Sequence, residues 1–122
     1  MITIDKDGTI FLYQGDSGEI NVYGLDKNHN YTVYFAVQDE KRDPIGTELQ
    51  VSTNNSDIAT FVLTPSFTDQ LTVPNNKPYK IYYYGIKACV SSSSIEDTLI
   101  VAGSCYGDLN RIVVYPRKVM GI

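Results

Sequence analysis

Apolar and polar residues alternate with a period of two along most of the chain, which is typical of strands that bury one face. The clearest example is residues 31–38, where Val33, Phe35 and Val37 share one face. The other face is apolar as well, so we expect this segment to be a central strand. A second long strand is expected over residues 79–90, with Gly85 marking a bulge or a close approach of another backbone.

Short clusters of Asp, Asn, Gly, Ser and Pro separate further strand segments. We expect shorter strands at residues 9–12, 19–23, 47–51, 58–63, 98–102 and 111–115, and the first of these leaves room for a short preceding strand at residues 2–4. The segment 47–51 has the weakest pattern and is expected to be an edge. Strands of this length and spacing predict an all-β fold, an antiparallel β-sandwich of about seven to eight strands.

One segment, residues 64–71, has the start signals of a helix. Thr64 can cap it and Pro65 suits the first helical position. We expect one or two turns there, forming a short crossover helix between the two sheets.

The chain has 122 residues, the size of one domain. We divide it into a β-sandwich domain at residues 1–115 and a C-terminal tail at residues 116–122, which is basic first and apolar at its end. The net charge of -4 argues against a general nucleic-acid binder. No signal peptide and no apolar run long enough to cross a bilayer is visible, so we expect a soluble protein made in a cytoplasm.

Residues that carry catalytic or metal chemistry are sparse. His29, the single histidine, lies between two asparagines in an expected turn, without the context of a catalytic triad or a zinc site. Without a secretory signal, Cys89 and Cys105 are interpreted as buried free thiols, and a disulfide between adjacent strands is the alternative. We therefore expect no catalytic residue, no metal and no cofactor, and hence no enzyme.

Ten tyrosines are an unusual number for this length, and they cluster at residues 82–84. One interpretation is that alternate tyrosines fill the core and cover the sheet. The other is that an exposed tyrosine stacks on a sugar ring or contacts another protein. Both interpretations stay open at this point.

Several segments, taken in order, resemble the N-terminal domain of the baseplate upper protein found in phages of Gram-positive bacteria. They are Gln14-Gly-Asp-Ser-Gly-Glu-Ile20, Tyr31-Thr-Val-Tyr-Phe-Ala-Val37, Phe61-Val-Leu63, Leu71-Thr-Val73, Pro78-Tyr79, Glu96-Asp-Thr-Leu-Ile100 and Ile112-Val-Val-Tyr-Pro116. Together these segments span nearly the whole chain. The resemblance implies an immunoglobulin-like sandwich that attaches a tail or fibre component to a phage particle.

Members of that family usually continue into a stem and further domains, whereas this chain stops at Ile122. We therefore expect a stand-alone version, located at a baseplate, tail, connector, head fibre base or capsid surface. It would be a homo-oligomeric structural protein of the virion, with other phage structural proteins and copies of itself as partners.

Contacts in such an assembly are expected to use strand edges, tyrosines and the chain ends. The candidate interaction residues are Tyr82, Tyr84, Arg117, Lys118, Met120 and Ile122. An alternative function is a carbohydrate-binding or adhesive β-sandwich that recognises a bacterial surface glycan. Two or three coplanar exposed aromatic side chains lining a groove would distinguish that function.

Overall fold

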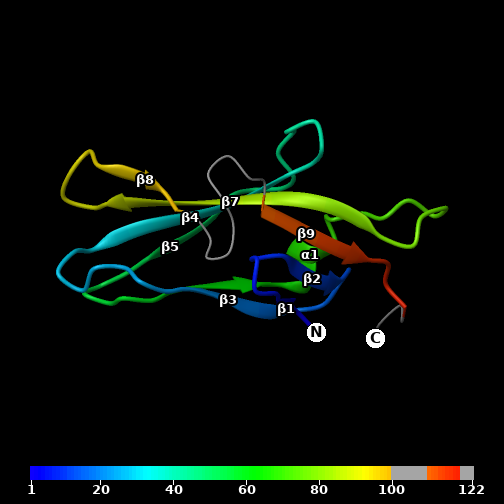
Figure 1. The fold of residues 1–122 in the computed structure, drawn as a ribbon, viewed down its shortest axis with the longest axis horizontal. Helices are drawn as coiled ribbons and strands as arrows, with labels where there is room; N and C mark the ends of the chain where they lie inside the picture. Colours follow the sequence, from blue (N-terminus) through cyan, green and yellow to red (C-terminus); the bar gives the residue numbers. More distant parts are fainter. Residues whose placement is uncertain (100–109, 119–122) are drawn as a thin grey trace.

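The computed structural model describes residues 1–99 and 110–118 and shows an almost entirely β architecture (Figure 1). The described strands are β1 (Thr3–Ile4), β2 (Ile10–Tyr13), β3 (Gly18–Val22), β4 (Tyr31–Gln38), β5 (Leu49–Ser52), β6 (Ala59–Leu63), β7 (Lys80–Val90), β8 (Glu96–Thr98) and β9 (Asn110–Tyr115). One short helix is present among these residues, α1 (Pro65–Thr68), which joins β6 to β7. The expected all-β sandwich with one crossover helix is confirmed.

Two layers enclose the core. The large sheet has the order β1-β2-β9-β7-β4-β5, with β8 also paired to β7, and the small sheet consists of β3 and β6. Figure 1 shows β4 and β7 in one layer and β3 in the layer opposite them. The buried side chains of both layers form one hydrophobic cluster, to which β2, β3, β4, β6, β7 and β9 all contribute.

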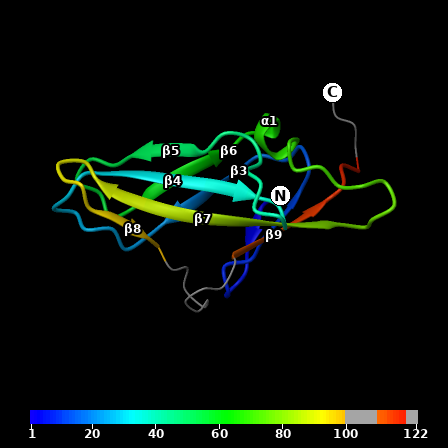
Figure 2. The ribbon, with the colours of Figure 1, turned by 90° about the horizontal axis from the view of Figure 1, so that it is seen from above.

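The long strands β4 and β7 form the centre of the large sheet, side by side in Figure 2. Their antiparallel ladder runs from Tyr31 opposite Val90 to Gln38 opposite Tyr83. Strand β5 pairs with β4 and ends the sheet. The predictions of a central strand at residues 31–38 and of an edge near residues 47–51 are therefore both confirmed.

The pairing of the first and last strands differs from the expected antiparallel arrangement. Strand β2 runs parallel to β9, with Ile10 opposite Ile112 and Tyr13 opposite Tyr115. Period-two alternation fixes which residues share a face but says nothing about the direction of a distant partner strand. The described strands number nine rather than seven or eight, because the two-residue β1 counts as a strand of its own.

The boundaries of the smaller elements follow local chemistry. The hydroxyl of Thr64 accepts a hydrogen bond from the backbone N–H of Phe67 at 3.2 Å, and Pro65 begins α1, as expected. Strand β8 covers residues 96–98 rather than 98–102, of which residues 100–102 lie outside the described part of the chain. Strand β9 ends at Tyr115, where the expected tail begins, and the division into domain and tail stays a prediction.

A buried hydroxyl fixes the corner between the two sheets. The Tyr82 hydroxyl, near the start of β7, donates to the backbone carbonyl of Thr72 at 2.6 Å. Thr72 lies in the connection between α1 and β7, so this bond ties the crossover to the sheet.

The described residues include no helix that is long and apolar enough to span a membrane.

Candidate functional site

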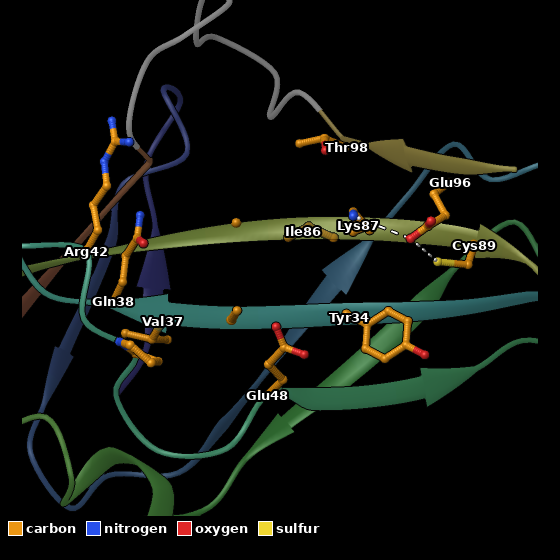
Figure 3. Close-up of a pocket in the computed structure, with 13 residues that line it drawn as sticks. Tyr34, Val37, Gln38, Arg42, Glu48, Ile86, Lys87, Cys89, Glu96 and Thr98 are labelled. Carbon is orange, nitrogen blue, oxygen red and sulfur yellow. Dashed lines mark hydrogen bonds and ion pairs between the residues drawn. The ribbon is translucent and has the colours of Figure 1, made fainter.

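An open groove of about 620 Å³ lies on the outer face of the large sheet, over β4 and β7 (Figure 3). Its lining residues come from β4, the connection between β4 and β5, β7 and β8. They are Tyr34, Ala36, Val37, Gln38, Arg42, Pro44, Glu48, Gly85, Ile86, Lys87, Cys89, Glu96 and Thr98. The groove faces away from the hydrophobic core, so it is a surface feature of the sheet rather than an internal cavity.

Two small residues form the floor of the groove. Ala36 of β4 and Gly85 of β7 lie directly opposite each other in the ladder, and both point outwards. A Cβ added to Gly85 would meet no atom within 4 Å, so the space above it is open. A glycine in the interior of a strand exposes backbone and permits close approach of a ligand or another chain.

Larger polar side chains form the walls. At one end Tyr34 of β4 lies opposite Lys87 of β7, and Lys87 Nζ lies 3.4 Å from Glu96 Oε1 of β8. Both partners of that ion pair are about half exposed, so it contributes at most about 1 kcal/mol to stability. Figure 3 shows Gln38 and Arg42 at the other end of the groove, which therefore presents both signs of charge.

The thiol of Cys89 lies within the groove, with Sγ 3.7 Å from Oε1 of Glu96. Desolvation, followed by the negative charge of Glu96, raises the pKa of the Cys89 thiol. The thiol is therefore held protonated at neutral pH, which makes it a weak nucleophile. Cys89 is a free cysteine, as expected, but it is only partly buried, because it lies on the outer face of β7 rather than in the core. Cys105 lies outside the described residues.

Metal and acid–base chemistry have little support among the described residues. No group of three or more His, Cys, Asp or Glu side chains in that part of the chain could hold a metal ion. His29 lies in a turn, 3.7 Å from Asp26 and edge-on to the ring of Tyr31, and it does not line the groove. The expectations of no catalytic residue, no metal and no cofactor stay predictions.

Two of the predicted interaction residues are buried instead. Tyr82 is 2% exposed and Tyr84 is 6% exposed, on the inner face of β7. The Tyr84 ring stacks on Phe35 at 5.3 Å, and its hydroxyl donates to the carbonyl of Gly8 at 2.5 Å. The prediction that these two tyrosines offer a contact surface is wrong. Both side chains are part of the core, and their hydroxyls donate hydrogen bonds to backbone carbonyls.

The basic part of the tail contacts its own domain. Arg117 Nη2 donates to Asp69 Oδ1 at 2.6 Å, and Lys118 Nζ lies 5.2 Å from the centre of the Tyr13 ring. These contacts place both residues against the end of the sandwich that carries α1. Their role in contacts with other proteins stays a prediction, and Met120 and Ile122 lie outside the described residues.

Sequence reasoning missed most of the groove, although it noticed one part of it. Gly85 stands out in the sequence as a glycine inside a strand pattern, and together with Ala36 it forms the floor of the groove. Tyr34 and Lys87 carry no separate signal, because an outward Tyr or Lys is ordinary on a solvated sheet.

No family model matches the chain, and no curated protein is similar to it in sequence. Among solved structures, the chain is similar to the one titled "Crystal Structure of the Periplasmic Chaperone SfaE", with a TM-score of 0.59 at 9% sequence identity. The match covers 93% of this chain and 56% of the chaperone chain, so this chain spans little more than half the length of that protein. At this identity the likeness shows the fold, an immunoglobulin-like sandwich, and leaves function open.

Proposed function

We propose that this chain is a non-enzymatic protein-docking module of a bacteriophage particle, and that the groove over β4 and β7 receives a partner protein. The observation that carries the proposal is the floor of the groove, where Ala36 and Gly85 leave open space on the outer face of an otherwise ordinary sheet. The resemblance of the ordered segments to phage baseplate upper proteins supports the phage assignment.

The chemistry of the groove suits a polypeptide. Its small floor residues let a partner segment approach the sheet closely, while Tyr34 offers an aromatic contact of the kind that dominates many interfaces. Around them, Arg42, Glu48 and Lys87 are exposed and carry both signs of charge. A small apolar centre with a polar rim is the usual anatomy of a non-obligate protein interface.

Within a particle, the partners would be other phage structural proteins and further copies of this chain. The chain would be made in the host cytoplasm and reside in the virion, at a tail, baseplate or fibre-attachment position. The tail at residues 116–122 would add contacts beyond the groove, in addition to the contacts that Arg117 and Lys118 make with the domain.

Glycan binding ranks second on the geometry of the groove. Tyr34 is the one aromatic side chain among the described residues that line it. A sugar-binding platform is expected to use two or three coplanar rings. A glycan array with the purified chain tests this alternative, and binding that Tyr34→Ala abolishes would favour it over docking.

Photo-cross-linking inside particles tests the docking proposal directly. A photoreactive phenylalanine analogue would replace Tyr34 in the groove or, as a matched control, Val62, which is 58% exposed on the opposite sheet. We expect position 34 to cross-link to a particle protein identified by mass spectrometry, and position 62 to give none. Absence of the chain from purified particles, or cross-links from position 62 alone, would contradict the proposal.

A further inference from the structure

Strand β5 has one edge that no described strand pairs with. It forms a ladder with β4 and ends the large sheet, and β6 passes close to it but pairs with β3 instead. Next to this ladder, the backbone N–H of Thr53 donates to the carbonyl of Tyr31 at 2.9 Å. That bond fixes which residues of β5 face β4.

Hydrogen-bonded and non-hydrogen-bonded pairs alternate along an antiparallel ladder. Since Thr53 bonds to β4, Val51 and Leu49 also direct their backbone groups towards β4. The backbone N–H and C=O of Gln50 and Ser52 then point away from the sheet, and both residues are exposed. The free edge therefore offers two donors and two acceptors at a spacing of two residues.

This edge lacks two of the features that normally prevent edge-to-edge pairing, although β5 itself has only four residues. Between Leu49 and Ser52 it has no charged residue and no proline. The other end of the same sheet differs, because β1 has only two residues and runs directly into Asp5, Lys6 and Asp7. The edge at β5 is therefore the longer of the two, and Glu48 directly precedes it.

We infer that two copies of this chain pair through β5, antiparallel, with Val51 of one copy opposite Val51 of the other. In this register Gln50 of each copy is opposite Ser52 of the second copy. The outward N–H and C=O groups of Gln50 and Ser52 in the two copies then form four hydrogen bonds across the junction. No like charges face each other across the junction, and the half-buried Val51 gains a matching apolar neighbour.

The pairing has a geometric consequence for the groove. An antiparallel junction of identical strands has its two-fold axis perpendicular to the sheet, so equal faces of the two sheets lie on the same side. Gln50 is opposite Tyr34 in the ladder, on the face that carries the groove. The dimer would thus present two grooves to one side. The inference itself rests on β5 alone and is independent of the docking role.

Sedimentation velocity of the full chain, over a roughly hundredfold range of concentration, tests the dimer. Gln50→Pro removes an outward N–H and leaves the bonds to β4 intact, because proline is tolerated on the free side of an edge strand. Gln50→Thr keeps that N–H and serves as the matched control. We expect a dimer for the wild type and for Gln50→Thr, and at least tenfold weaker association for Gln50→Pro.

Two results would overturn the inference. The first is a monomeric wild type at every concentration, which would leave this edge to a different chain or to none. The second is a Gln50→Pro variant that dimerises as tightly as the wild type while circular dichroism shows an intact fold.

The register is tested by introducing single cysteines and looking for a disulfide-linked dimer on a non-reducing gel. The wild-type chain is the control for disulfides formed by its native cysteines. Val51→Cys places two thiols across the two-fold axis, within reach of a disulfide. Gln50→Cys is more exposed, but its Cα atoms would lie roughly 8 Å apart in this register, beyond that reach. We expect a covalent dimer from Val51→Cys alone, and efficient cross-linking through Gln50→Cys would overturn the register.

Discussion

The two faces of β7 have the same backbone and opposite chemistry. On the inner face, Tyr82, Tyr84 and Ile86 are buried and fill the space between the sheets. On the outer face, Gly85 leaves open space beside Ala36 of β4. One face of this strand therefore specifies the fold, and the other carries the groove that we propose as a docking site.

The contrast extends to the polar groups. Both tyrosine hydroxyls on the inner face are committed to backbone carbonyls, of Thr72 and of Gly8. On the outer face, the exposed Lys87 makes a solvated ion pair with Glu96. Substitutions on the inner face should therefore change stability, and substitutions at the floor of the groove should change binding.

Tyr84→Ala should have the largest effect on stability. It removes a buried ring that stacks on Phe35 and leaves the carbonyl of Gly8 without its hydroxyl donor. Truncation of a buried aromatic side chain costs about 3–5 kcal/mol in free energy of unfolding. Urea denaturation of the two chains measures this loss, and a loss below about 1 kcal/mol would show that the inner face is not tightly packed.

Tyr82→Phe should have a smaller effect, because the ring stays and only the hydroxyl is lost. The carbonyl of Thr72 then loses its 2.6 Å hydrogen bond at the corner between the sheets. We expect a loss of about 1–2 kcal/mol in free energy of unfolding. Tyr83→Phe, on the outer face of the same strand, is the matched control and should leave stability unchanged.

Alkaline pH should weaken the fold through Tyr84. Burial, followed by the negative charge of Asp7, raises the pKa of Tyr84 from 10.0 to about 12. The unfolded chain therefore loses this proton first, so the contribution of Tyr84 to stability is complete below pH 10 and is lost as the pH rises towards 12. Absorbance titration should show one late-ionising tyrosine that is missing in Tyr84→Phe.

Gly85→Ala should have the smallest effect on stability, and the opposite sign. The added Cβ meets open space, and alanine costs less conformational entropy than glycine in a strand. We expect a change between zero and a gain of about 1 kcal/mol. A clear loss of stability would mean that the outer face is packed after all.

Period-two alternation predicted which residues share a face, but it did not predict which face points inwards. Alternation places Tyr82 and Tyr84 on one face of β7, yet the pattern alone allows that face to be core or surface. Both faces of this strand carry tyrosine, a residue that suits either environment. Only the packing against Phe35 and the backbone of the N-terminal turn decides between them.

Local sequence signals predicted local structure correctly, whereas contacts between residues far apart in the sequence were not predicted. The cap of α1 depends on residues three apart and was predicted from Thr64 and Pro65. The ion pair of Arg117 with Asp69 joins positions 48 residues apart, and the parallel pairing of β2 with β9 joins the two ends of the chain. The sequence pattern contains no direct information about such distant neighbours. From the pattern alone, the tail residues are therefore expected to contact other proteins rather than their own domain.

The most direct test of the docking role compares two substitutions at the floor of the groove. Gly85→Tyr fills the open space, whereas Gly85→Ala barely enters it, and both should fold as the wild type does. The measurement is the amount of each variant incorporated into purified phage particles when it replaces the wild-type chain. We expect normal incorporation of Gly85→Ala and at least a roughly tenfold loss for Gly85→Tyr, because the tyrosine would block a central contact. Incorporation of Gly85→Tyr at the wild-type level would contradict the docking role.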